Sequence, residues 1–213
     1  MQKVLLSAAA TAAFSLTSFS AAAVTQQGAF IGINGGSSHY SLNHYNTNFN
    51  DYNDTAFGAV AGYRWVVDRP FALGVEAGYV DLGQLKAGQG YISYSYEDKY
   101  KGQALLLGVN GKWDLPHGFT ITARGGFAHS RTKLDERVTY NNYYNNTYPT
   151  DHYHETSNDN GFYAGVGFGY DFSENIGVTL TYDYYGLKAH DITGDHHTID
   201  VGVTGAALEY RFW

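Results

Sequence analysis

The segment Phe127-Ala128-His129-Ser130-Arg131 places a histidine beside a serine, and these residue types act as base and nucleophile in many hydrolases. A serine hydroxyl is activated only when the base lies within hydrogen-bond distance. In a β-strand, successive residues point to opposite faces, so His129 and Ser130 would be held apart. No carboxylate partner for the histidine is evident. We therefore predict no catalytic residue and expect His129 at the aqueous end of a strand.

Two other segments combine residue types that bind metal ions, Asp151-His152-Tyr153-His154-Glu155 and Asp195-His196-His197. Imidazole and carboxylate groups at such short spacing are ligands for transition metals. Both segments lie in long polar connections that we expect to be external loops. A labile surface metal site and a solvated loop are both consistent with this pattern, and we favour the solvated loop. The sequence thus predicts no metal and no cofactor.

Charged residues form a third candidate set. They fall within segments whose large apolar residues alternate with small or polar ones, and they lie on the small-residue side. In a closed barrel this side faces the lumen, and it would hold four basic and four acidic residues: Arg64, Glu76, Lys112, Arg124, Asp171, Asp183, Glu209 and Arg211. A confined charge is costly unless it is paired, so equal numbers are expected. We favour a salt-bridged plug over an ion path gated by exchange of partners.

Residues 161–186 show most clearly which elements would position these charges. Before and after the break at Ser173-Glu174-Asn175, large apolar residues occupy every second position. A period of two is typical of a β-strand with one apolar face. The opposite face consists mainly of glycine, threonine and aspartate, which is too small for a water-exposed surface. We therefore expect the apolar face to contact lipid.

Eight such segments lie near residues 29–40, 55–66, 71–84, 100–114, 118–132, 159–172, 175–187 and 197–212. Their connections alternate between tight turns, at 67–70, 115–117 and 173–175, and long polar stretches, at 41–54, 85–99, 133–158 and 188–196. This alternation is typical of barrels in the bacterial outer membrane. The predicted fold is all-β, an eight-stranded antiparallel up-and-down transmembrane β-barrel. Its lumen is just wide enough for side chains to fill it, and we expect small and polar residues there.

The last segment does not keep one phase. The apolar residues before Gly205 and after Ala207 fall on opposite parities, Ile199, Val201 and Val203 on one and Leu208, Tyr210 and Phe212 on the other. Either a bulge at residues 205–207 shifts the phase, or the assumed register is wrong there.

The N-terminus and the overall charge bear on location and partners. Residues 1–23 have a short basic start, an apolar stretch and small residues at the end, which is typical of a secretory signal peptide. We therefore divide the chain into a signal peptide, 1–23, and a barrel domain, 24–213. Removing Lys3 leaves 12 of the 13 basic residues against 20 acidic ones, a net charge of −8. This charge argues against nucleic acid and anionic surfaces as partners. The absence of cysteine excludes disulfides.

The chain resembles the OmpA transmembrane domain and related small outer-membrane barrels over roughly residues 28–213. The resemblance rests on four short motifs in order: Leu73-Gly74-Val75-Glu76-Ala77-Gly78-Tyr79, Tyr100-Lys101-Gly102-Gln103, Ala123-Arg124-Gly125-Gly126 and Tyr210-Arg211-Phe212. It implies an integral outer-membrane protein with a structural, adhesive or surface-interaction role. Glu76 and Arg124 match two members of an interior charge cluster of OmpA proposed to gate ions. The other positions of that cluster fall on uncharged residues, Asn110, Gly169 and Thr179.

Residues 140–148 read Tyr-Asn-Asn-Tyr-Tyr-Asn-Asn-Thr-Tyr, a composition suited to recognition. Tyrosine supplies rigid contact area, and asparagine supplies adaptable hydrogen bonds. The segment could bind a host protein or glycan, or it could face the lipopolysaccharide layer. The predicted loops 133–158 and 41–54 are the expected contact surfaces, and the candidate contact residues are Tyr143, Tyr144, Tyr148 and Tyr153.

These observations predict a non-enzymatic protein of the bacterial outer membrane that acts through its extracellular loops. The first alternative is a narrow pore for ions or small solutes. The second is a lipid-modifying enzyme, because His129-Ser130 is similar to the His/Ser pair of lipid A deacylase barrels, which has one residue between the two. The expected partners are outer-membrane lipid and lipopolysaccharide, the barrel assembly machinery and host surface molecules, but no nucleic acid. We expect a monomer.

Overall fold

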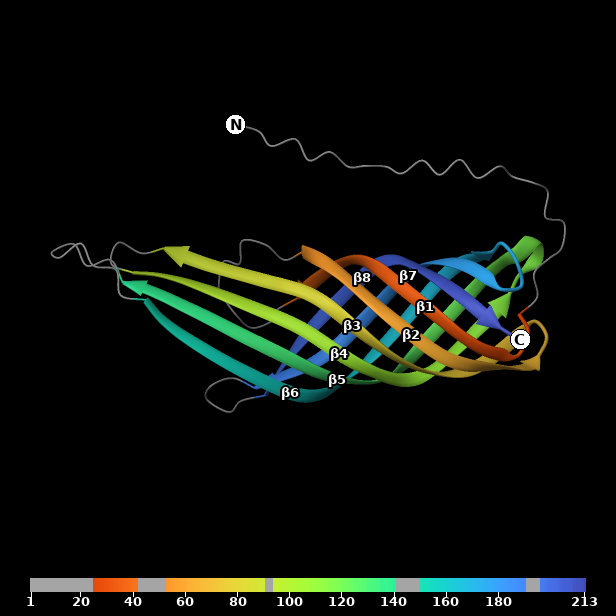
Figure 1. Ribbon diagram of the computed structural model, residues 1–213, viewed down its shortest axis with the longest axis horizontal. Coiled ribbons are helices and arrows are strands. Elements are labelled where there is room, and N and C mark those ends of the chain that lie inside the picture. Colours follow the sequence, from red (N-terminus) through yellow and green to blue (C-terminus); the bar gives the residue numbers. More distant parts are fainter. Residues whose placement is uncertain (1–24, 42–52, 91–93, 141–149, 191–195) are drawn as a thin grey trace, which may run out of the picture.

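The computed structural model describes residues 25–41, 53–90, 94–140, 150–190 and 196–213, and it is a closed barrel of eight antiparallel strands (Figure 1). The strands are β1 Gly28–Ser41, β2 Asn53–Asp68, β3 Phe71–Gly90, β4 Tyr94–Asp114, β5 Phe119–Tyr140, β6 Thr150–Asp171, β7 Ile176–His190 and β8 His196–Phe212. Each strand pairs with its neighbours in the sequence, and β1 also pairs with β8. This confirms the predicted fold. Within the described residues, no helix is long and apolar enough to cross a membrane.

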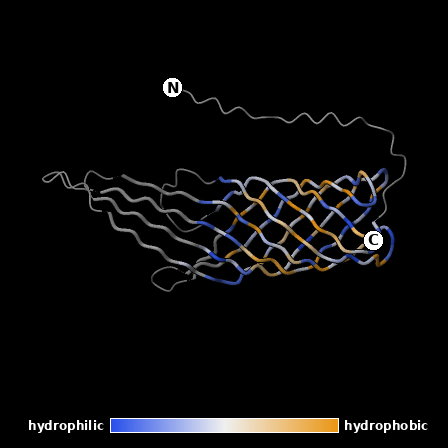
Figure 2. Tube along the Cα trace, in the orientation of Figure 1, coloured by the Kyte–Doolittle hydropathy of each residue, from blue (hydrophilic) through white to orange (hydrophobic). Residues whose placement is uncertain are grey.

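The predicted alternation explains the two faces of the barrel wall. Leu107 is 64% exposed, Phe127 is 78% exposed and Leu180 is 65% exposed, whereas their chain neighbours Leu106 and Ala128 are buried. Figure 2 shows apolar residues concentrated in the middle of the barrel. So large an exposed apolar surface is unfavourable in water but matches the outward band of a membrane barrel. The wall therefore contacts lipid.

The tight turns lie at one end of the barrel, where residue 213 also lies (Figure 1). Arg69 and Pro70 join β2 to β3, and a short 3-10 turn, Pro116–Gly118, joins β4 to β5. Positive φ angles at His117 (65°) and Gly118 (83°) reverse the chain within this turn. In the third turn, the Ser173 hydroxyl accepts hydrogen bonds from the backbone N–H groups of Asn175 and Ile176. The predicted tight turns are confirmed.

The opposite end differs from the prediction, because four strands are longer than expected. The stretches 85–99 and 133–158, predicted to be loops, are largely strand. Beyond the level at which β2 stops pairing with β3, β3 to β6 continue as a four-stranded sheet (Figure 1). We call this sheet, residues 84–90, 94–101, 133–140 and 150–158, the extension. The sequence pattern missed it because polar residues occur on both of its faces.

The last strand also corrects an expectation. The pairing of β8 with β7 and with β1 is continuous through residues 205–207, so there is no bulge there. Val201 and Val203 are buried in the lumen, on the same side of β8 as Arg211. The apolar residues change parity because the upper lumen is apolar, not because the strand slips. Register shifts occur instead between Val66 and Asp68 and between Asp81 and Gln84.

Candidate functional site

All eight residues of the predicted interior charge set lie in the lumen. Six of them are buried, and Arg124 and Glu209 are half-buried. They come from seven strands, β2 to β8, and the alternation within each strand turns them inward. The set divides into two groups at different heights in the barrel.

The lower group, near the tight turns, is arranged around two carboxylates. The Asp171 carboxylate lies 2.8 Å from Lys112 Nζ and 2.7 Å from Arg211 Nη1. Glu209 accepts two hydrogen bonds from the Arg64 guanidinium, at 2.9 and 3.0 Å. It also lies 3.8 Å from Lys112 Nζ and 3.7 Å from Arg211 Nε. Three cations and two anions thus form one connected network.

Two uncharged residues complete this lower group. Arg64 Nε donates a hydrogen bond of 2.8 Å to Asn110 Oδ1, and the Arg64 guanidinium carbon lies 4.3 Å from the centre of the Phe30 ring. A cation over an aromatic face is stabilised by the ring quadrupole. The bidentate contact with Glu209 adds a fixed geometry. Arg64 is therefore held from three directions.

The upper group carries the opposite charge excess, with one cation and two anions. Arg124 Nε donates to Asp183 Oδ1 at 2.8 Å, and Arg124 Nη1 lies 3.9 Å from Glu76 Oε1. The Tyr163 hydroxyl donates a hydrogen bond of 2.8 Å to Glu76 Oε1. Since the lower group has one excess positive charge and the upper group one excess negative charge, the whole set is neutral. Its partners lie on strands that are not neighbours, so it links opposite walls of the lumen.

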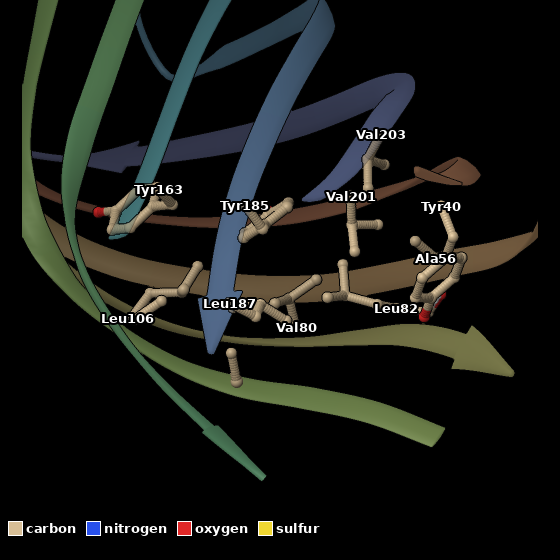
Figure 3. Close-up of a cluster of buried hydrophobic side chains, with 12 residues drawn as sticks. Tyr40, Ala56, Val80, Leu82, Leu106, Tyr163, Tyr185, Leu187, Val201 and Val203 are labelled. Atoms are coloured by element: carbon tan, nitrogen blue, oxygen red, sulfur yellow. Dashed lines mark hydrogen bonds between the residues drawn. The ribbon is translucent and has the colours of Figure 1, made fainter. Parts of the chain in front are cut away.

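Towards the extracellular end, the lumen is filled by an apolar cluster that the sequence analysis did not predict. Figure 3 shows these side chains between the strands. The expectation of a small and polar lumen is therefore wrong for this half of the barrel. The cluster consists of Tyr40, Ala56, Val80, Leu82, Ala104, Leu106, Ala128, Tyr163, Tyr185, Leu187, Val201 and Val203.

A signal for this cluster was present in the sequence. Val80 shares the parity of Glu76 on β3, and Leu106 shares the parity of Lys112 on β4. Leu105, Leu106 and Leu107 are all apolar, so their alternation is invisible in a hydropathy pattern. The charged residues mark which alternate positions of each strand face the lumen. Following these positions along the strand towards its extracellular end leads to the residues of the cluster.

Above the outer aromatic residues Tyr79 and Phe127, polar contacts close the rim of the barrel. The Tyr40 hydroxyl and the Ser38 hydroxyl both donate to the Leu82 carbonyl, at 3.0 and 2.8 Å. Burial, together with the nearby carboxylates of Asp54 and Asp81, raises the pKa of the Tyr40 hydroxyl above its usual range. The tyrosine therefore stays neutral and remains a hydrogen-bond donor.

Asp81 takes no part in these hydrogen bonds to the Leu82 carbonyl, and its side chain contacts β4 instead. Burial acts to raise the pKa of its carboxyl, but hydrogen bonds from Gln103 and the Gly83 N–H, together with Lys101, hold the pKa below its usual value. The Lys101 Nζ lies 3.3 Å from Asp81 Oδ2. Asp81 is thus a carboxylate with fixed partners.

The His/Ser pair is separated as the alternation predicts. His129 is exposed on the outer face of β5, and its Nδ1 lies 2.8 Å from Asn160 Oδ1. Ser130 is buried, and its hydroxyl donates to the Asp159 carbonyl at 3.2 Å. The two side chains point to opposite faces of the wall. This arrangement does not form a nucleophile and base pair.

The predicted loop residues are only partly described. Tyr143, Tyr144 and Tyr148 lie outside the described residues, whereas Tyr153 belongs to β6 and pairs with Glu136 of β5. The segment 151–155, predicted to be an external loop, is part of the same strand. Of the second His-rich segment, Asp195 lies outside the described residues, and His196 and His197 begin β8.

Comparison with known proteins gives the same architecture. The family model described as outer membrane protein beta-barrel domain matches residues 6–212. No curated protein matches the chain. Among solved structures, Ail of Yersinia pestis, the attachment invasion locus protein, is 14% identical with a TM-score of 0.46, covering 87% of this chain and 100% of that one. It has also been solved with the heparin analogue sucrose octasulfate.

Two further solved structures are similar at comparable levels. OprG of Pseudomonas aeruginosa is 13% identical with a TM-score of 0.46, covering 90% of this chain and 100% of that one. OmpW of E. coli is 15% identical with a TM-score of 0.43, covering 88% and 99%. Together with the family match over almost the whole chain, the closed barrel and its lipid-facing wall establish that this protein belongs to the outer membrane protein β-barrel domain family and is located in the bacterial outer membrane.

Proposed function

We propose that this protein is a non-enzymatic surface-interaction protein whose contact surface is the extension of β3 to β6. The observation that carries this proposal is the length of the paired sheet outside the barrel. β2 pairs with β3 only as far as Asp81, but β3 and β4 remain paired as far as Gly90 and Ser95. β6 pairs with β7 only from Phe162, yet β5 and β6 are already paired at Thr139 and Thr150.

At about 3.3 Å per residue, these additional stretches project roughly 30–40 Å along the strands. A barrel needs no such projection to cross the membrane. The paired backbone instead gives any contact residues on it a fixed position, which lowers the entropy lost on binding. This is the arrangement expected of a recognition surface held away from the lipid.

The composition of one face of the extension supports the proposal. We define its inner face as the positions that continue the lumen side of each strand, as Ala104 does on β4 and Ala128 on β5. The register places five tyrosines on this face: Tyr94, Tyr96, Tyr100, Tyr140 and Tyr153. Tyrosine is common in binding surfaces because it combines contact area with a hydrogen-bonding group.

A shortened hairpin tests the proposal. Lys133 and Thr156 are register partners, so residues 134–155 can be replaced by a two-residue Asn-Gly turn that keeps the strands paired. We expect the refolded wild type to bind host matrix proteins or glycans in an array, and the shortened variant to lose at least tenfold in affinity for each of them. Gel mobility before and after heating would show that the variant is a folded barrel.

The matched control shortens the hairpin of β7 and β8. Lys188 and Thr198 are also register partners, and replacing residues 189–197 by Asn-Gly leaves the extension intact. This control should bind as the wild type does. Equal loss in both variants, or no binding by the wild type to any array component, would contradict the proposal.

The narrow pore is the second candidate function, and the apolar cluster disfavours it. Leu82 and Val201 are fully buried in the lumen above the charged groups, so an ion would have to cross an apolar layer without partners. We expect little conductance from the wild type in planar bilayers. Well-resolved channels that change with Glu76→Ala or Arg124→Ala would overturn this expectation and favour the gated path.

The remaining proposals concern assembly. Within the described residues, every strand of the barrel wall has two paired neighbours. Closure leaves no edge in the membrane for a second copy, which supports a monomer. Strand β8 carries the outward aromatic residues Tyr210 and Phe212, which supports insertion by the barrel assembly machinery.

A further inference from the structure

Residues 25–27, which precede β1, leave the barrel wall at its tight-turn end. The backbone N–H and the hydroxyl of Thr25 donate hydrogen bonds to the two carboxylate oxygens of Asp114, both at 2.7 Å. Asp114 is the last residue of β4. Gln26 Nε2 donates a hydrogen bond of 3.1 Å to Glu174 Oε2, in the turn between β6 and β7. We call residues 25–27 the strap.

The order of the strands indicates that the strap passes over the opening of the barrel rather than around its rim. β1 starts at Gly28 and pairs with β2 on one side and with β8 on the other. Around the ring, the end of β4 is reached from β1 through β2 and β3, whereas the turn between β6 and β7 is reached in the opposite direction, through β8. The strap spans at most roughly 10 Å and contacts both places, so it crosses the mouth of the barrel. The burial of Thr25, which is 2% exposed, agrees with this path.

Both anchor points of the strap adjoin the lower group of charges. Asp114 follows Lys112 by two positions on β4, so the two residues lie on the same side of the strand. Glu174 follows Ser173, whose carbonyl accepts a hydrogen bond of 3.2 Å from Arg211 Nη2. The strap therefore covers the lower group on the side of the tight turns.

A covering segment explains why the lower group is so deeply buried. The side chains of Lys112, Asp171 and Arg211 are at most 3% exposed, although they lie close to one end of the barrel. Their mutual attraction depends on the exclusion of water, because water weakens Coulomb interactions between charged groups. A charged network at this depth needs a cover, and the strap lies where the cover is needed.

From this geometry we propose that the strap is a removable cover of the lumen, held closed by Asp114, and that its release admits water to the lower group. The Asp114 carboxylate accepts both hydrogen bonds of Thr25, whereas the contact between Gln26 and Glu174 is exposed and contributes little. Docking therefore depends on one carboxylate, and the strap can detach without unpairing any strand. The strap lies at the opposite end of the barrel from the extension, so this role goes beyond the proposed function and does not depend on it.

Maleimide labelling tests whether the strap is docked. The chain has no cysteine, so Thr25→Cys and Gln27→Cys each introduce a single thiol, the first at a buried position and the second at an exposed one. In protein purified from the outer membrane, we expect Thr25→Cys to react about tenfold more slowly than Gln27→Cys, or slower still. Equal rates would overturn the proposal, and this comparison leaves Asp114 unchanged.

Asp114→Ala, added to Thr25→Cys, should release the strap and raise the labelling rate to within about twofold of that of Gln27→Cys. The backbone N–H of Asp114 keeps its hydrogen bond to the Pro70 carbonyl, so the adjacent turn retains its backbone contact. The matched control is Asp68→Ala, which removes an exposed carboxylate at the end of β2, at the same end of the barrel. It should leave the slow labelling of Thr25→Cys unchanged. Slow labelling with Asp114→Ala, or fast labelling with Asp68→Ala, would overturn the role assigned to Asp114.

A second measurement distinguishes a cover from a segment that only adds stability. If release of the strap admits water, the lower group is already solvated in Asp114→Ala. Asp171→Ala should then lower the urea midpoint of unfolding by less than about half as much in the Asp114→Ala background as in the wild type. Equal shifts in the two backgrounds would show that the strap does not exclude water from the lower group, and they would overturn the proposal.

Discussion

Asp171→Ala is expected to lower the free energy of unfolding by about 3–5 kcal/mol, the cost typical of removing one partner from a buried ion pair. The Asp171 carboxylate contacts both Lys112 and Arg211, and the side chains of all three are at most 3% exposed. Without it, two cations remain confined, with Glu209 as their nearest carboxylate at 3.7 and 3.8 Å. The barrel would have to admit water or separate its strands to solvate them.

Equilibrium unfolding in urea, with the barrel in phospholipid vesicles and tryptophan fluorescence as the signal, measures this loss. The control is Glu174→Ala, which removes an exposed carboxylate from the adjacent turn and should change the free energy by less than about 0.5 kcal/mol. The double variant Asp171→Ala/Lys112→Ala should regain part of the loss, because it leaves one unpaired cation instead of two. A loss under about 1 kcal/mol in Asp171→Ala would show that water already solvates the lower group.

The membership of this charged network followed from the sequence, but its pairing did not. Parity alone turns Lys112, Asp171 and Arg211 inward, since each alternates with lipid-facing residues. Which cation meets which anion depends on how the strands tilt and close, because β4, β6 and β8 are not neighbours. No local pattern contains that information. Glu76 is an example of a pairing that the sequence does not reveal. Its nearest partner is the hydroxyl of Tyr163, and a set chosen by formal charge does not include a tyrosine.

The fold shows the same division between local and long-range information. The eight strands and their tight turns were predictable because lipid on one side and a narrow lumen on the other impose a strict period of two. Outside the membrane this constraint disappears, so the extension carries polar residues on both faces and its sequence predicts loops. The change of parity at Val201 and Val203 has a related cause. The sequence predicts a polar lumen throughout, whereas the upper half of the lumen is filled by apolar side chains.

Leu180→Arg should have the second largest effect, a loss of about 2–4 kcal/mol if the residue lies near the middle of the bilayer. Leu180 is 65% exposed on the outer face of β7, and its register partners are Phe168 of β6 and Ala206 of β8. It is midway between Ile176, where the strand begins, and Tyr184. An arginine there would lie in hydrocarbon without a partner, unless it displaced lipid or reached one of the interfaces.

Two control substitutions define what this result would mean. Ser41→Arg places the same side chain at an exposed site at the extracellular end of β1, and it should have little effect on the free energy of unfolding. Gly167→Leu tests the opposite face at a similar height, because a Cβ there would lie 2.5 Å from Thr179 Cγ2 and 2.7 Å from Thr122 Oγ1. It should lower the folding yield through crowding of the lumen rather than through lipid exposure. If Leu180→Arg refolds with unchanged yield and stability while Gly167→Leu fails, the wall at β7 would face water or protein instead of lipid.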